Sequence, residues 1–110
     1  MTLTREKITN ILSEKSEYLA EAYGVKRIGL FGSYARGTHT EDSDIDIIVE
    51  FETPLGFEFM DFADYLEELL GKRVDVLTVG GLQGIRIPHI AQSIRESIVY
   101  VQQNRFCELF

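Results

Sequence analysis

The sequence predicts an α/β (α+β) fold in which a mixed sheet of three or four strands is flanked by helices. Short apolar runs of strand length alternate with longer stretches of helical periodicity. The chain has 110 residues, which is room for one domain, expected over residues 1–110, with 102–110 as an interface or flexible tail. One predicted strand ends at Gly32-Ser33 and the next begins at Asp44. Those two ends can meet only if the strands are antiparallel, so the sheet is expected to be mixed.

The chain is expected to begin with a helix that reaches about Tyr23. Thr2 or Thr4 can cap its start, and Gly24 can end it. Its apolar residues recur at helical spacing with charged residues between them: Ile8, Ile11, Leu12, Leu19 and Ala22. No residue of this helix is assigned to chemistry, and we interpret it as scaffold.

A Gly-Ser turn follows the first predicted strand, at about 26–31, and leads into a short helix that Gly37 can end. A strand that enters a helix through Gly32 and Ser33 leaves backbone N–H groups facing solvent. These groups, together with the helix dipole, attract phosphate. Gly32 and Ser33 are therefore candidate phosphate-binding residues. Arg36 either reaches the same phosphates or pairs with an acid of the next loop.

Two carboxylates stand at the start of the second predicted strand, at about 44–51. Side chains alternate along a strand, so Asp44 and Asp46 project from one face while Ile45 and Ile47 enter the core. Asp75 is a third candidate, in a predicted strand at 72–78. Two carboxylates about 4 Å apart repel by about 4 kcal/mol at an effective dielectric near 20, so three converging carboxylates require protons or cations. Hard oxygen ligands of this kind suit Mg²⁺ or Mn²⁺.

The remaining elements follow from the same patterns. A helix is predicted at about 57–70, with Gly71 closing it, and the glycines at 80, 81 and 84 are expected to form a flexible crossing. A last helix starts at Pro88, and a short strand can form over 98–101. His39 and His89 have no spaced partner and are assigned no role.

Charge is distributed unevenly along the chain, whose formal net charge is −7. The segment 38–71, here called the acidic stretch, contains eleven Asp or Glu residues and no Lys or Arg. A duplex-binding protein normally presents a basic face to the phosphates, so direct duplex nucleic-acid binding is not expected. No apolar run approaches the length of a membrane span or signal peptide, and Cys107 is alone, so we expect a cytoplasmic protein without an internal disulfide.

The motif Gly32-Ser33, ten intervening residues, then Asp44-x-Asp46 resembles the signature of the nucleotidyltransferase superfamily that includes DNA polymerase beta and the kanamycin nucleotidyltransferases. Within it, the short chain with Gly-Ser-Tyr-Ala-Arg-Gly and Ser-Asp-Ile-Asp is most similar to the minimal nucleotidyltransferases, the antitoxin partners of HEPN-domain ribonucleases. The similarity extends from the first helix to about Val101, and its specificity comes from residues 32–46 and Asp75.

The resemblance implies Mg²⁺-dependent transfer of AMP from ATP to a hydroxyl, a tyrosine of a HEPN-type toxin. Asp44, Asp46 and Asp75 would be the catalytic, metal-binding residues for two ions, with Mn²⁺ as a substitute for Mg²⁺. Gly32, Ser33 and Arg36 would hold the triphosphate. Two alternatives remain open: a binding antitoxin that only masks the toxin, and modification of a small molecule such as an aminoglycoside.

Overall fold

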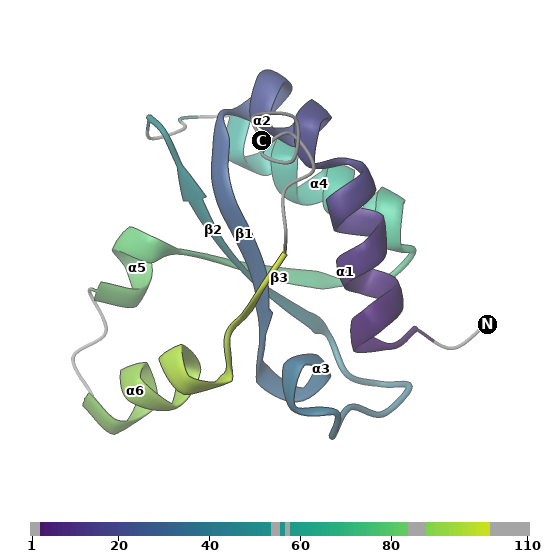
Figure 1. The fold of residues 1–110 in the computed structure, drawn as a ribbon, viewed down its shortest axis with the longest axis vertical. Coiled ribbons are helices and arrows are strands. Elements are labelled where there is room, and N and C mark those ends of the chain that lie inside the picture. The colour runs from purple at the N-terminus through teal and green to yellow at the C-terminus, as the bar shows by residue number, and fades with distance from the viewer. Residues whose placement is uncertain (1–2, 54–55, 57, 84–87, 102–110) are drawn as a thin grey trace, which may run out of the picture.

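The sheet is mixed, as predicted. The computed structural model describes residues 3–53, 56, 58–83 and 88–101. In these residues four strands lie in the order β3-β2-β1-β4 (Figure 1). β1 is antiparallel to both β2 and β4, whereas β2 and β3 are parallel. The strand bounds are β1 Val25–Phe31, β2 Ile45–Phe51, β3 Val74–Thr78 and β4 Val99–Tyr100.

Helices cover both faces of the sheet. Figure 1 shows α5 and α6 on the other side of the strands from α1 and α4. The helix bounds are α1 Arg5–Glu14, α2 Ser16–Tyr23, α3 Gly32–Arg36, α4 Glu58–Leu70, α5 Val79–Gln83 and α6 Pro88–Ser97. Within the described residues, no helix combines the length and the apolar character needed to cross a membrane.

The main core lies between the sheet and the helices α1, α2 and α4. Ile45 and Ile47 of β2 enter it and are fully buried, which confirms the alternation predicted for this strand. The predicted stripe of the first helix contributes Ile8, Leu12 and Leu19 to this core, and α4 contributes Phe62 and Leu66. Burial of side chains of this size stabilises a fold by about 1.5–3 kcal/mol each, which fixes β2 in place.

A second apolar cluster covers part of the opposite sheet face, which the sequence pattern did not reveal. Ile48 is fully buried there, although it shares a strand face with Asp46. It packs against partly buried side chains from β1, β3, α5, α6 and the position after α6: Phe31, Leu77, Val79, Ile94 and Ile98. The face of β2 that carries Asp46 is therefore apolar at the next position on that face, Ile48.

The predicted first helix is two helices, with a break at Lys15 (φ −97°, ψ 4°). The buried Ser16 donates its hydroxyl to the Ser13 carbonyl at 2.8 Å, and such side-chain bonds compete with the regular helix pattern. Thr4 does cap the start, since its Oγ1 accepts the Lys7 N–H at 3.2 Å. Ala22 is exposed, so its predicted place in the apolar stripe was wrong.

The glycine-rich crossing is partly helical. Gly80 and Gly81 lie in α5, where the Thr78 hydroxyl accepts the Gly81 N–H at 2.9 Å and caps the turn. Strand β2 begins at Ile45, so Asp44 precedes the strand by one residue instead of starting it. Gly84, Cys107 and the 102–110 tail lie outside the described residues.

Candidate functional site

Two of the candidate carboxylates share one row of the sheet. Asp46 of β2 is in register with Asp75 of β3 on one side and with Phe31 of β1 on the other. The row across β3, β2 and β1 is therefore Asp75, Asp46 and Phe31, and Phe31 directly precedes the Gly-Ser turn. Asp44 lies just before β2, half-buried, and Asp75 is exposed. Because β1 and β2 are antiparallel, the end of β1 with Gly32 and the start of β2 with the carboxylates lie at the same end of the sheet.

Gly32 approaches Asp46 so closely that no side chain fits between them. A Cβ built on Gly32 would lie 2.2 Å from Oδ2 of Asp46, and Gly32 has φ +71°. Both its contact distance and its left-handed backbone favour glycine. The Gly-Ser turn and the Asp46 carboxylate are therefore neighbours in space, not only in the motif.

The other candidate phosphate-binding residues lie along α3. Ser33 is half-buried in its first turn, and Arg36 is exposed in its last turn. The Gly32 N–H, which was predicted to face solvent, instead donates to the Ser97 hydroxyl of α6 at 3.4 Å, and that hydroxyl donates to the Ile94 carbonyl. Ser97 is a neighbour of the turn that sequence reasoning missed, because no motif or spacing marks it.

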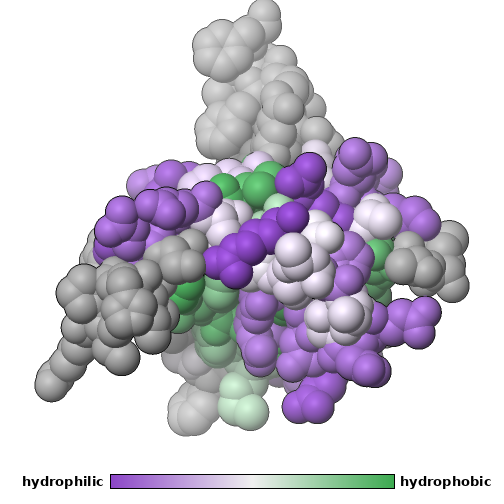
Figure 2. Space-filling model, turned by 90° about the horizontal axis from the view of Figure 1, so that it is seen from below, coloured by the Kyte–Doolittle hydropathy of each residue, from purple (hydrophilic) through white to green (hydrophobic). Residues whose placement is uncertain are grey.

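The carboxylate of Asp46 interacts electrostatically with the other two candidate carboxylates. Burial raises the pKa of Asp46 above its ordinary value, and the charges of Asp75 and then Asp44 raise it further. The charges of both other candidate carboxylates therefore act on Asp46. Figure 2, seen from below where α3 lies in Figure 1, shows that the described surface at this end is mainly hydrophilic.

The donor set fits Mg²⁺ in its chemistry. Three interacting carboxylates are the hard oxygen ligands that this cation prefers, and a cation would relieve their repulsion. In the part of the chain that the structure describes, no three Asp, Glu, His or Cys side chains are already drawn together as a metal-binding group. Cation binding would therefore require the three side chains to rotate toward a shared ion. It would not require a change in the pairing of β2 and β3.

The raised pKa of Asp46 predicts a pH dependence of stability. From the ordinary value of 3.8 up to the folded pKa, the folded state holds more protons than the unfolded state, so stability falls as pH rises through this window. Asp46→Asn cannot ionise and should lack this loss. The free energy of unfolding is measured with denaturant in EDTA from about pH 4 to pH 7. The stability of the variant relative to the wild type should rise with pH at first and then become constant. A stability difference independent of pH would contradict the assignment.

A mixed sheet whose Gly-Ser turn meets carboxylates on two adjacent strands is the arrangement expected from the resemblance to the nucleotidyltransferases. Comparison with protein families gives the same class, because residues 6–101 match the model described as Nucleotidyltransferase domain. The chain belongs to this family, and it is a nucleotidyltransferase.

Similar proteins of known name or structure agree with this assignment. The chain is 44% identical over 100 residues to the protein adenylyltransferase MntA of Thermococcus cleftensis, covering 90% of this chain and 97% of that protein. It resembles a solved structure provisionally described as a minimal nucleotidyltransferase, with TM-score 0.67, 30% identity and coverage of 88% and 95%. A crystal structure of a toxin-antitoxin with AMP-PNP is similar at TM-score 0.62 and 26% identity, covering 88% of this chain and 78% of that one.

Proposed function

We propose that the chain is an antitoxin that transfers AMP from ATP to a tyrosine hydroxyl of a HEPN-type toxin ribonuclease. The observation that carries the proposal is the row in which Asp46 and Asp75 stand in register beside Gly32, with Asp44 next to them. Nucleotidyl transfer needs cation ligands next to a turn that binds phosphates, and these residues are our candidates for both.

Each candidate residue has a role in this reaction. Asp44 and Asp46 would hold two Mg²⁺ ions, with Asp75 on one of them, while Gly32 and Ser33 hold the β- and γ-phosphates and Arg36 reaches the triphosphate. When bound, the ions would neutralise charge on the triphosphate. The acceptor oxygen forms a bond to the α-phosphorus, and the bond from that phosphorus to pyrophosphate breaks. Asp75, exposed at the row's end, takes the hydroxyl proton.

Three considerations support a protein acceptor. The relative at 44% identity is named as a protein adenylyltransferase, and the similar crystal structure combines a toxin-antitoxin with AMP-PNP, an ATP analogue. The described elements are occupied in building one sheet and its two helical covers, so a partner has to orient the acceptor. The acidic stretch also favours a partner with a basic face, as a ribonuclease that grips RNA phosphates would have. Because ATP is the proposed donor, we expect the reaction to take place in the cytoplasm.

The proposal is tested by label transfer. The chain, Mg²⁺, ATP labelled in its α-phosphate and the HEPN-type protein are incubated together. Label should appear on the partner, EDTA should prevent this, and the chain alone should consume ATP slowly, because no acceptor is then positioned. Added salt should weaken association, since attraction between charged surfaces is screened. Label transfer that is equally fast in EDTA would contradict the metal assignment.

A further inference from the structure

The loop that leads into Asp44 is a compact unit. This loop, residues 38–44, is folded by four local hydrogen bonds among Thr40, Asp42 and Ser43, one of them between the Thr40 and Ser43 hydroxyls at 3.4 Å. The Thr40 N–H donates to the Ser43 hydroxyl at 2.9 Å, and the Ser43 N–H donates to the Thr40 carbonyl at 3.1 Å. The Asp42 N–H donates to the Thr40 hydroxyl at 3.3 Å. Because these bonds are internal, they shape the loop without fixing it to the rest of the molecule.

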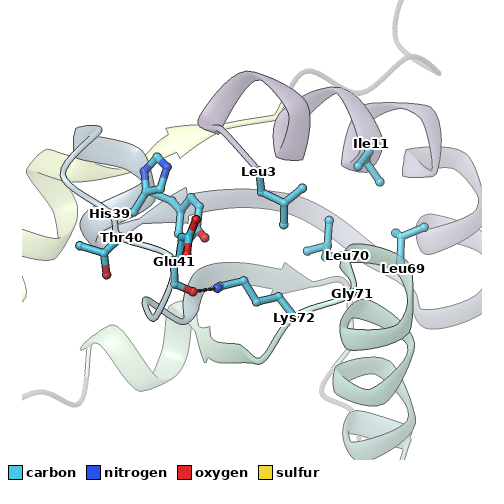
Figure 3. A pocket seen from close by; sticks show the side chains of 10 residues that line it. Leu3, Ile11, His39, Thr40, Glu41, Leu69, Leu70, Gly71 and Lys72 are labelled. Carbon is cyan, nitrogen blue, oxygen red and sulfur yellow. Dashed lines mark hydrogen bonds between the residues drawn. The ribbon is translucent and has the colours of Figure 1, made fainter. Parts of the chain in front are cut away.

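Lys72 connects this loop to the strand that carries Asp75. It lies in the turn 71–73 between α4 and β3, and its Nζ donates to the Glu41 carbonyl (Figure 3, dashed line). One step further along, the Ile45 N–H donates to the Arg73 carbonyl at 3.0 Å. The Glu67 carboxylate in turn accepts the Val74 N–H at 3.1 Å, which holds the start of β3 to α4. Hydrogen bonds therefore hold the turn to both β2 and α4, and Lys72 extends from this turn to the middle of the loop.

A hollow lies on the side of the loop that faces α1 and α4. The pocket has a volume of about 660 Å³ and is lined by apolar side chains of these helices, including Ile11 and Leu69, as well as by His39, Thr40 and Glu41 of the loop (Figure 3). At the loop's start, His39 stacks on the buried Tyr34 with 4.1 Å between ring centroids. The middle of the loop borders this pocket and is not closely packed on that side. The position of the loop therefore depends more strongly on the hydrogen bond from Lys72.

Asp44 differs from the other two candidate ligands in what fixes its position. Asp46 and Asp75 are set by paired strands, whereas Asp44 lies outside the strand, at the end of the loop that Lys72 holds. A shift of the loop would therefore move Asp44 relative to Asp46 and leave the register of the sheet unchanged.

We propose that Lys72 is a positioning residue that sets Asp44 against Asp46 and Asp75 for cation binding. It acts through the Glu41 backbone and touches neither the nucleotide nor the reacting atoms. The inference rests on the proposed function, because it assumes that Asp44 is a metal ligand. Loss of the Lys72 ammonium should raise the cation concentration that the site needs, with little effect on the fold.

The test is a titration of the chain with Mn²⁺ alone, in which free Mn²⁺ is followed by electron paramagnetic resonance. Lys72→Met keeps the aliphatic stem and removes the donor, and we expect a dissociation constant about tenfold higher, the order expected for loss of one charged hydrogen bond. Lys72→Arg should restore binding to within about twofold of the wild type, because it keeps a charged donor. Lys15→Met removes an exposed charge at the junction of α1 and α2 and should bind like the wild type.

The outcomes separate the inference from the function on which it rests. If the wild type does not bind Mn²⁺, the metal site itself is wrong. If the wild type binds and Lys72→Met binds equally well, the positioning role is wrong. Equal weakening by Lys72→Met and Lys15→Met would also overturn it, because the loss would then not depend on the bond to the loop, and a general charge effect would strengthen Mn²⁺ binding instead. Thermal unfolding in EDTA should give the Lys72 and Lys15 variants similar midpoints.

Discussion

Replacing Gly32 with alanine should lower AMP transfer by at least about 100-fold, the order expected when a catalytic group is displaced by about 1 Å. The added Cβ would lie 2.2 Å from Oδ2 of Asp46, so the carboxylate has to move away from the turn. The left-handed backbone at φ +71° adds strain of about 1 kcal/mol. Transfer is measured with labelled ATP and the partner, and stability by denaturant unfolding.

Gly24→Ala is the matched control for this substitution. Gly24 has nearly the same backbone, φ +72°, but a Cβ there would have no atom within 4 Å. Its alanine variant should therefore suffer the backbone strain without the clash and keep most of the transfer activity. If Gly32→Ala and Gly24→Ala transfer AMP equally well, the contact between the turn and Asp46 has no part in the reaction.

Replacing Asp44 and Asp46 together by asparagine should lower transfer by at least about 1,000-fold while the chain stays folded. Asparagine keeps the size of each side chain and removes the charge that would hold a cation. The burial and repulsion that raise the pKa of Asp46 show that its ionised form is unfavourable in the free protein, so the exchange should not destabilise the fold.

Glu14→Gln with Glu17→Gln is the control for the loss of two charges. Both residues are exposed, on α1 and α2 and outside the acidic stretch, and their replacement should leave transfer within about twofold of the wild type, as for most surface changes. Circular dichroism and thermal unfolding in EDTA compare the two double variants. Unfolding of the Asp44, Asp46 variant would show that these acids are structural.

Alternation and helix signals were enough to predict most of the fold. Ile45 and Ile47 point into the core, Gly24 and Gly37 end helices in the left-handed conformation, and β1 and β2 are antiparallel. The first two features depend on neighbouring residues, and local preference is readable from the sequence. The antiparallel pairing was predicted because Gly32-Ser33 and Asp44 were expected to meet. The break at Lys15 was missed because the apolar spacing continues through it, while a buried serine alters the backbone pattern.

The site was predictable where it depends on a motif and was missed where it depends on packing. The register of Asp46 with Asp75 follows from a parallel pairing that the sequence suggests only indirectly. Ser97 contacts the Gly-Ser turn from 65 residues away, and Lys72 contacts the loop before Asp44 from 31 residues away. No spacing rule links such positions. Burial of Ile48 was hidden because α5 and α6 cover a face that alternation marks as polar.

Part of the acidic stretch is engaged within the chain. Glu50 forms an ion pair with Arg27 at 2.9 Å, and Glu67 accepts the Val74 N–H. The charge available to a partner is therefore smaller than the composition suggests. Exposed acids on α4, such as Asp61, Asp64 and Glu68, still present a negative helix face.

The central claim, that this chain silences its partner by covalent AMP addition, is tested most directly by the intact mass of the partner. The HEPN-type protein is incubated with ATP, Mg²⁺ and either the wild-type chain or the Asp44→Asn, Asp46→Asn variant, and its ribonuclease activity is measured in parallel. We predict that the wild type adds whole AMP increments to the partner mass and abolishes its activity, and that the variant adds none. An unchanged partner mass together with blocked ribonuclease activity would contradict the enzymatic account and show that binding alone masks the toxin.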